Sequence, residues 1–318
     1  MSHFNICSNI NNGVGLQKDA ELLRDLLISW GHTVKLLHYK KQNQIEEAPH
    51  AVANIFLEVV NYDLIARNIS KENWMIPNPE WFAPWDHKNG LPDFHRVLCK
   101  TQDAVRIMNK LTDVNKVSFI GFESRDMYDA DVPRERKFLH IAGQSRYKNT
   151  MATTYAFAKM SLDDGPRPDL TIVGAYPDEY AFGQGAKNIR TMERISDDEM
   201  KHLLNSHQFH IMAAGYEGWG HALHEGLSCG AVVLTTDHPP MNEFDGVARN
   251  LLIPYQDTIP ELSATRARVV AVPIWTAVKK ASTMKTDEIE NISKHAREAF
   301  LAERKEFRES FKKAVNSL

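Results

Sequence analysis

Two successive series of short apolar strands and amphipathic helices follow one another along this chain. Strands expected at 4–7 and 33–37 flank a helix expected at 16–30, which together make a β-loop-α-β unit. Parallel neighbours need such a crossover connection, so the unit predicts a parallel sheet covered by helices. A second series of this kind begins at Phe138, after the polar stretch 124–137. The pattern predicts an α/β protein with two parallel-sheet domains.

Length and composition agree with this organisation. A chain of 318 residues that is 43% hydrophobic and 25% charged is long enough to divide into two cores, and its composition excludes collagen, coiled coil and intrinsic disorder. With 38 basic and 41 acidic residues the formal net charge is -3. The whole chain therefore has no excess of positive charge that would favour nucleic acid or an anionic membrane.

The cysteines and the start of the chain bear on its location. Cys7, Cys99 and Cys229 are odd in number, far apart and in no C-x-x-C arrangement, which is typical of reduced thiols. The first residues show no basic segment followed by an apolar one, and no apolar run approaches the ~18 residues of a membrane span. We predict a cytoplasmic protein without a membrane span.

Further elements follow from periodicity and from capping residues. The first half predicts strands at 63–66, 74–76 and 96–99, and a helix whose N-cap is Thr101. The second half has the following predicted elements: strands at 138–142, 170–173, 209–212 and 231–235, and helices at 150–160, 197–204 with Ser196 as N-cap, 221–229 and 286–315. We predict domains at 1–130 and 131–284, with residues 285–318 forming a C-terminal helix that packs back on the first domain.

The most informative segment is a glycine-rich turn between two predicted strands. It reads Glu217-Gly218-Trp219-Gly220 and leads into the helix that begins near His221. Glycines allow backbone conformations and close approaches that a Cβ atom would block. The N–H groups of the first turn of a helix can receive a phosphate, helped by the helix dipole. Glu217 lies in the turn and Glu225 in the helix, so both carboxylates can face one ligand.

This segment resembles the retaining glycosyltransferases of family four. Their signature has a Glu-Gly-aromatic-Gly turn, a second Glu after seven intervening residues, a Cys-Gly at the helix end and a strand that ends in Thr and Asp, as 217–237 do here. The resemblance implies the GT-B fold, which consists of two Rossmann-like parallel-sheet domains facing a cleft, with a C-terminal helix that returns to the first domain. It also implies transfer of a hexose-like sugar from a nucleotide diphosphate sugar to a hydroxyl acceptor, with retention of configuration.

The resemblance assigns roles to the residues of the turn and of the helix. Glu217 would lie near the sugar hydroxyls, and Glu225 would bind the ribose hydroxyls. The remaining donor-binding residues that it implies are Gly218, Trp219, Gly220, His221, Ala222 and Leu223, the last two through their backbone amides. The alternative is an ordinary helix start with incidental acidic residues.

A basic segment upstream supports this interpretation. Gly143, Ser145, Arg146 and Lys148 follow the predicted strand 138–142, where the family has a glycine and two basic residues. By resemblance, Arg146 and Lys148 bind the diphosphate and stabilise it as a leaving group. Cationic side chains offset the charge of a departing diphosphate without a metal ion. Gln144 stands where the family commonly has Arg, which makes Lys148 the firmer assignment.

In the first domain, Gly13 and Gly15 occupy the loop after the first strand, which in GT-B enzymes lies close to the donor. A dinucleotide-binding G-x-G-x-x-G fingerprint is incomplete here, because Lys18 takes the place of its third glycine. The two glycines serve either donor contact or a tight turn.

The fourteen histidines of the chain form no H-E-x-x-H motif, which would be typical of a metal site. We therefore expect no cofactor and no obligatory metal.

The acceptor is the least determined partner. Trp74, Trp81, Phe82 and Trp85 cluster near a Pro-rich loop and serve either to stack on an acceptor or to anchor that loop. The acceptor is a glycan, a small molecule or, against the charge balance, a modified DNA base. Two other classes stay open: another GT-B enzyme such as a nucleotide-sugar epimerase, and a non-catalytic module that binds nucleotide sugars.

Overall fold

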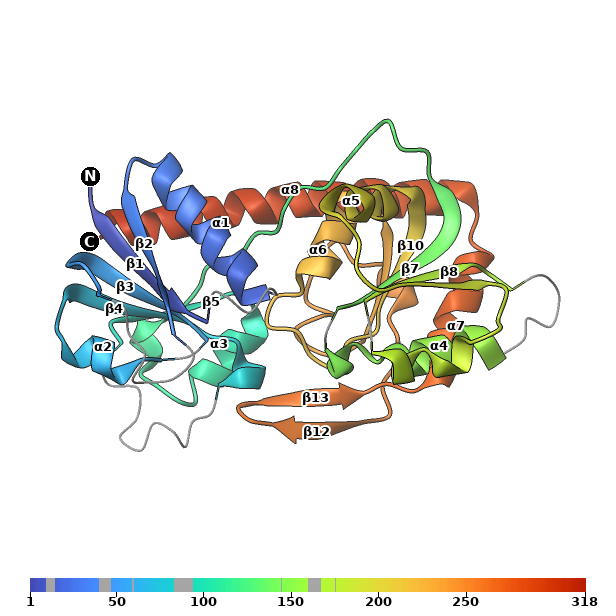
Figure 1. The fold of residues 1–318 in the computed structure, drawn as a ribbon, viewed down its shortest axis with the longest axis horizontal. Helices are drawn as coiled ribbons and strands as arrows, with labels where there is room; N and C mark the ends of the chain where they lie inside the picture. The colour runs from blue at the N-terminus through green and yellow to red at the C-terminus, as the bar shows by residue number, and fades with distance from the viewer. Residues whose placement is uncertain are drawn as a thin grey trace. The chain divides into compact units, whose positions relative to one another are not determined.

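The computed structural model describes residues 1–9, 15–39, 47–58, 60–82, 94–143, 145–159, 167–174 and 176–318 (Figure 1). These residues form two compact units. The first unit comprises Met1–Glu123, Pro260–Thr265 and Lys305–Leu318, and the second comprises Ser124–Ile259 and Arg266–Arg304. The first change of unit lies between Glu123 and Ser124, at the start of the polar stretch that the sequence shows.

The first unit contains a six-stranded parallel sheet in the order β2-β1-β3-β4-β5-β6. Its strands are β1 (His3–Ser8), β2 (Thr33–His38), β3 (Ala51–Leu57), β4 (Ser70–Ile76), β5 (Arg96–Cys99) and β6 (Val117–Phe119). Phe4 of β1 pairs with Val34 on one side and with Ala53 on the other. The direction in which strands are added therefore reverses between β1 and β3, which is the usual ligand-binding position in open α/β sheets.

Three helices of the first unit follow from local sequence signals. They are α1 (Gly15–Ser29), α2 (Tyr62–Ala66) and α3 (Gln102–Met108). Leu16, Ala20, Leu23 and Leu27 are buried on one face of α1, at the spacing that the sequence predicts. The Thr101 side chain accepts a hydrogen bond from the Ala104 N–H at the start of α3, so this predicted N-cap is confirmed.

The predicted strand at 63–66 is wrong, because these residues form α2. The Asn61 side chain accepts a hydrogen bond from the Leu64 N–H and so caps this helix.

The sequence analysis also missed the strand β3, which precedes α2 in the chain. Asn54 interrupts its apolar pattern, yet Asn54 is buried and bonds Asn5 of β1 and Asn73 of β4 at 2.9 and 3.0 Å. A polar side chain is thus satisfied across neighbouring strands.

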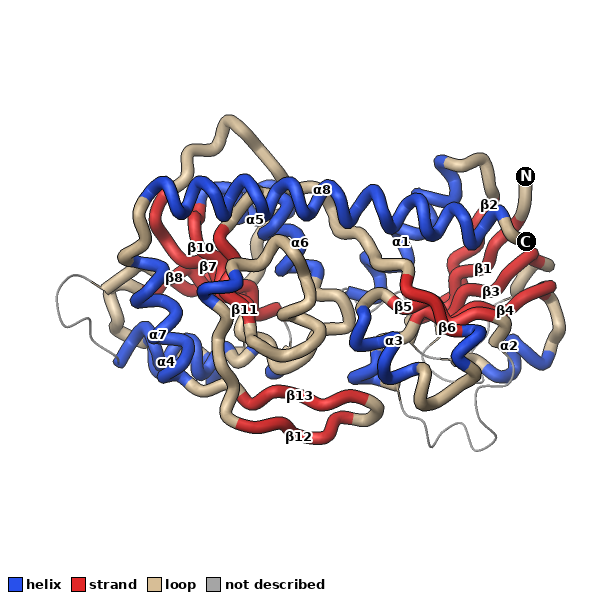
Figure 2. Tube along the Cα trace, turned by 180° about the vertical axis from the view of Figure 1, so that it is seen from behind, coloured by secondary structure: helices blue, strands red, loops and turns tan. Residues whose placement is uncertain are grey.

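The second unit contains a five-stranded parallel sheet in the order β11-β10-β7-β8-β9, and its strands lie side by side in one layer (Figure 2). The strands are β7 (Glu135–Gly143), β8 (Leu170–Gly174), β9 (Ile189–Met192), β10 (His207–Met212) and β11 (Val232–Thr235). The helices are α4 (Thr150–Lys159), α5 (Asp197–Ser206), α6 (His221–Ser228) and α7 (Ala271–Ser282). Residues 135–137 belong to β7, so the polar stretch is shorter than predicted.

Aromatic packing holds this sheet and its helices together. Phe138 of β7 and Phe209 of β10 are register partners, and their rings stack at 4.7 Å between centroids. Phe157 of α4 packs edge-on against Phe138 and against Trp275 of α7. The sequence analysis missed α7 and also a two-stranded hairpin made of β12 (Asp257–Glu261) and β13 (Ala264–Arg268).

The last helix, α8 (Thr286–Asn316), matches the predicted helix at 286–315. Its residues up to Arg304 belong to the second unit and those from Lys305 to the first. Phe307 and Phe311 pack against Phe122 and Trp74 of the first unit, with ring centroids 5.0 and 6.5 Å apart respectively. Within the described ranges, no helix combines the length and the apolar character needed to cross a membrane.

A buried ion pair in the first unit gives a prediction about stability. The Lys100 ammonium lies 2.5 Å from the Asp19 carboxylate and also donates to Asn78 at 3.0 Å, and its side chain is 2% exposed. Lys100→Met leaves the Asp19 charge buried without its cation, so we expect a loss of about 3–5 kcal/mol in urea unfolding. The double variant with Asp19→Asn should recover part of this loss. Lys110→Met, at an exposed position, is the control and should change stability by less than about 0.5 kcal/mol. Equal effects of the two lysine variants would contradict this prediction.

Candidate functional site

The glycine turn lies after β10 and leads directly into α6. Gly220 is the N-cap of α6 and has a left-handed backbone, with φ 81° and ψ 62°. A residue with a Cβ atom rarely adopts this conformation, which explains the glycine. Gly220 has no side chain with which to cap this helix start. Ala222 and Leu223 lie in its first turn, so their amides have the position that the sequence analysis predicts for phosphate binding.

The basic segment follows β7, and local contacts fix its backbone conformation. Arg146–Lys148 form a one-turn helix, and the Ser145 hydroxyl accepts from the Tyr147 N–H at 3.3 Å. Gly143 and Asn149, on either side of this turn, have left-handed backbones with φ of 59° and 54°. The left-handed Asn149 allows the chain to pass from this turn directly into α4.

Hydrogen bonds join the basic segment to the residues between β10 and the glycine turn. The Gly215 N–H donates to the Tyr147 carbonyl at 2.7 Å, and the Asn149 side chain donates to the Ala213 carbonyl at 2.7 Å. The Arg266 guanidinium lies over the Tyr147 ring, 4.6 Å from its centroid. Because β7 and β10 are parallel neighbours, both segments lie at the same edge of the sheet and support each other.

The structure brings two predicted site residues into direct contact. Lys148 Nζ forms an ion pair with Glu217 Oε1, although 69 positions of sequence separate the two residues. The side chains are only 18% and 17% exposed. A charge pair that is mostly shielded from water interacts more strongly than one on the open surface. The pair thus places a cation and a carboxylate side by side at the start of α6.

Arg146 has a different environment from Lys148. Its guanidinium pairs with Asp178 at 2.8 Å and lies over the Tyr176 ring, and its side chain is 59% exposed. The hydrogen bond between the two charged groups raises the pKa of Arg146 and lowers that of Asp178. The predicted basic pair is therefore divided, with Lys148 directed to Glu217 and Arg146 to the segment after β8.

The remaining residues of the turn are held by a side chain that the sequence analysis did not single out. Ser124 accepts a hydrogen bond from the Trp219 indole N–H at 3.0 Å, and its hydroxyl lies 2.8 Å from Nδ1 of His221. Ser124 is buried, as is Glu225 on α6. Ser124 opens the polar stretch before β7, about a hundred residues from the turn, so no local pattern could have identified it.

A buried histidine supports the basic segment from below. Nδ1 of His140 on β7 lies 2.9 Å from the Ile211 carbonyl oxygen, and Nε2 lies 3.0 Å from the Thr150 hydroxyl. A carbonyl only accepts, so Nδ1 carries the proton and Nε2 accepts from Thr150. Burial lowers the pKa of His140 to about 4, so the ring is neutral near pH 7. The His140 ring thus joins β7, β10 and the start of α4, close to Lys148.

Gly13 and Gly15 are the predicted site residues of the first unit. Gly15 is the first residue of α1 in the first unit, and Gly13 and Gln144 lie outside the described residues. Of the aromatic residues considered for the acceptor, Trp74 and Phe82 are buried in the first unit, Trp81 is exposed, and Trp85 is outside the described ranges. Because Trp74 and Phe82 are buried, the interpretation that they anchor the loop applies to these two residues.

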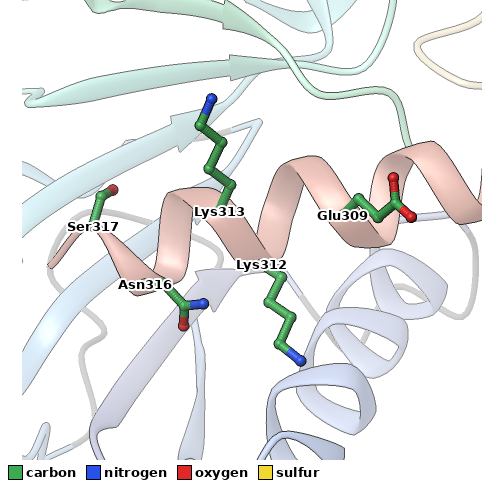
Figure 3. A pocket seen from close by; sticks show the side chains of 5 residues that line it. All are labelled: Glu309, Lys312, Lys313, Asn316 and Ser317. Carbon is green, nitrogen blue, oxygen red and sulfur yellow. The ribbon is translucent and has the colours of Figure 1, made fainter.

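Two surface hollows lie elsewhere. One follows the last turns of α8 and is lined by Glu309, Lys312, Lys313, Asn316 and Ser317 (Figure 3). The other is lined by Arg167, Asp169 and residues 185–188. Neither contains a predicted site residue. In the part of the chain that the structure describes, no three His, Cys, Asp or Glu side chains gather in a way that could hold a metal ion.

Comparison with protein families gives a match within the second unit. Residues 129–257 match the family model described as glycosyl transferases group 1. The matched segment contains Lys148, Glu217 and Glu225, and it agrees with the resemblance to glycosyltransferases that the sequence shows. A comparison with curated protein sequences gives no match.

Comparison with solved structures addresses the whole chain. Sucrose-phosphate synthase from Thermosynechococcus elongatus has a TM-score of 0.75 at 12% identity and covers 100% of this chain and 99% of its own. Anabaena HepE, solved in complex with UDP-glucose, has a TM-score of 0.68 at 11% identity and covers 100% of both chains. The lipopolysaccharide outer core galactosyltransferase WaaB has a TM-score of 0.63 at 11% identity and covers 99% of both chains. These likenesses confirm the GT-B fold.

The neutral state of His140 leads to a prediction about pH. The pKa of this ring is near 6.5 in an unfolded chain and about 4 when folded, so below pH 6.5 the unfolded state binds the proton more readily. The stability that depends on the neutral ring is full above pH 6.5 and is lost as the pH falls toward 4. We expect His140 to lower the unfolding free energy by about 1–2 kcal/mol between pH 7 and pH 5.

Urea unfolding at several pH values measures this effect. Because His140→Gln removes the titrating group, its unfolding free energy should depend less steeply on pH, whatever its absolute stability. His202→Gln, at an exposed position, is the control and should keep the wild-type slope. A slope that His140→Gln leaves unchanged would show that the buried ring does not titrate in this way.

Proposed function

Because residues 129–257 match the glycosyl transferases group 1 and the chain has the GT-B fold, we propose that it transfers a hexose-like sugar from a nucleotide diphosphate sugar to a hydroxyl acceptor, with retention. One observation carries this proposal. Lys148 and Glu217 form a shielded ion pair beside the uncapped start of α6. A diphosphate needs a cation and free backbone donors in one place, and a sugar needs a carboxylate that accepts from its hydroxyls.

Lys148 would act on the leaving group. When the bond between the sugar C1 and the phosphate oxygen breaks, negative charge accumulates on the departing nucleoside diphosphate. A cation fixed beside that oxygen lowers the barrier, because it interacts more strongly with the transition state than with the intact donor. Arg146 would reach the same diphosphate only by leaving Asp178, so we assign it a weaker contribution.

Glu217 and Glu225 would hold the two ends of the donor. Glu217 is fixed by Lys148 and accepts hydrogen bonds from sugar hydroxyls, while Glu225 on α6 accepts from the ribose hydroxyls. The amides of Ala222 and Leu223 donate to the phosphates between them. Gly218, Trp219 and Gly220 keep the turn close to the diphosphate, and His221 begins the helix that faces it.

Retention follows from a front-face route in this proposal. Glu217 already pairs with Lys148, which suits a hydrogen-bond acceptor better than an attacking nucleophile. The acceptor oxygen bonds C1 on the face from which the diphosphate departs. The acceptor proton passes to the departing phosphate oxygen, so charge and atoms balance without a covalent enzyme intermediate.

A panel of nucleotide sugars that includes UDP-glucose tests the donor part of the proposal. A bound donor raises the melting temperature by mass action and needs no acceptor. We expect Lys148→Ala to reduce this shift and to lower kcat about 10²–10³-fold in the transfer assay, as loss of one charge-stabilising group does. Lys294→Ala, on the exposed face of α8, is the matched control and should behave as wild type.

Several outcomes would contradict the proposal. Full turnover by both Lys148→Ala and Glu225→Ala would disprove the site assignment. An isomerised nucleotide sugar without transfer would indicate an epimerase. Binding without hydrolysis or transfer across a broad acceptor panel would indicate a binding module, and salt-sensitive binding to duplex DNA would direct attention to a modified base as acceptor.

We also propose that transfer needs no divalent cation, because Lys148 and the α6 amides supply the positive charge at the diphosphate. Incubation with EDTA followed by the transfer assay should leave kcat and KM within about twofold of the untreated enzyme. An activity that EDTA abolishes and Mg²⁺ or Mn²⁺ restores would refute this part of the proposal.

A further inference from the structure

A histidine packs directly behind the glycine turn. His224 lies one turn into α6 and is 1% exposed. Its ring stacks on the Trp219 indole, with centroids 3.8 Å apart and planes inclined by 10°, and it meets the Phe244 ring edge-on at 4.4 Å. Trp219 belongs to the turn, so the position of the His224 ring and that of the turn depend on each other.

Both ring nitrogens of His224 face an oxygen atom. Nδ1 lies 3.1 Å from the Gly220 carbonyl, which only accepts. Nε2 lies 3.5 Å from Oε2 of Glu303 on α8, and both of these atoms are buried and make no hydrogen bond. A neutral ring carries one proton, so either tautomer leaves a lone pair facing an oxygen. One more proton, on Nε2 or on the Glu303 carboxyl, satisfies both contacts.

Several other charged groups on the packed elements have partners of their own. Arg297 and Arg304 each pair with Asp126, His295 pairs with Asp245, and the His221 ring contacts Ser124. Glu225 is the next residue along α6 and is buried. His224 contacts Glu303 in this setting.

We propose that His224 and Glu303 share one proton and act as positioning residues for the glycine turn. This inference rests on the proposed function, in which the turn binds the donor. With the proton present, the ring donates to Gly220, contacts Glu303 through a proton and stacks as a cation on Trp219, an arrangement that indole favours. Without it, two acceptors face each other in a buried place, which is unfavourable.

The proposal predicts how the turn depends on pH. When the pH rises enough to remove this proton, the contacts of His224 with Gly220 and Trp219 weaken. We therefore expect donor affinity to decrease. Glu303→Gln replaces the carboxylate by an amide, whose N–H donates to Nε2 of the neutral ring at any pH. The variant should therefore lose the pH dependence while keeping the contact. Glu303→Ala removes the contact at every pH.

Histidine and indole NMR signals test the shared proton without any ligand. His224→Gln and Trp219→Phe assign the signals of the two rings. In the wild type, the His224 ring nitrogens and the Trp219 indole should shift together in one titration step. In Glu303→Gln this joint step should be absent. A His224 ring that stays in one neutral tautomer throughout, or a joint step that Glu303→Gln retains, would overturn the inference.

Calorimetry with UDP-glucose as the probe tests the effect on the turn. We expect the wild-type affinity to decrease three- to tenfold across the NMR step, Glu303→Gln to bind with the same affinity throughout, and Glu303→Ala to bind three- to tenfold more weakly than wild type at low pH. Glu298→Gln, at an exposed position of α8, is the control and should follow the wild type. Equal pH dependence in wild type and Glu303→Gln would overturn the inference. If wild type binds no nucleotide sugar of the panel, the proposed function fails, and the NMR step still decides whether the proton is shared.

Discussion

The parallel pairing of β7 with β10 is the constraint on which the candidate site depends. Phe138 and Phe209 are register partners with stacked rings, and this pairing fixes where both strands end. The segments that follow them then begin at one edge of the sheet, and hydrogen bonds from Gly215 and Asn149 hold them together. Lys148 and Glu217 meet because of this geometry, which neither segment could create alone.

Features that depend on neighbouring residues could be predicted from the sequence. The left-handed Gly220 before α6, the Thr101 cap and the Ser196 capping box each follow from residues within four positions. The strand β3 could not be recognised in the same way, because Asn54 looks unfavourable until Asn5 and Asn73 are seen beside it. Local patterns show where a chain turns, while strand partners decide whether a polar residue is tolerated.

The same distinction separates the predicted from the unpredicted parts of the site. The family signature supplied the types and order of Glu217, Glu225 and Lys148, but it gave no partner for any of them. Arg146 pairs with Asp178 and not with the group around Lys148. Ser124 contacts Trp219, which lies 95 positions away in the sequence. Such contacts arise when distant segments pack, so a one-dimensional pattern contains no signal for them.

The ion pair also explains why the glycine turn and the basic segment must occur together. In the proposed function, a diphosphate that binds Lys148 would compete with Glu217, which is already in place and shielded from water. Lys148 alone would therefore gain little by exchanging one anion for another. The uncapped amides at the start of α6 supply donors that Glu217 does not use, and they add favourable interactions that only the phosphate can make. In the proposed function, selectivity for a diphosphate over a simple carboxylate would come from the backbone of the turn, and contacts that fix this backbone, such as that of Ser124 or of His224, would contribute to it.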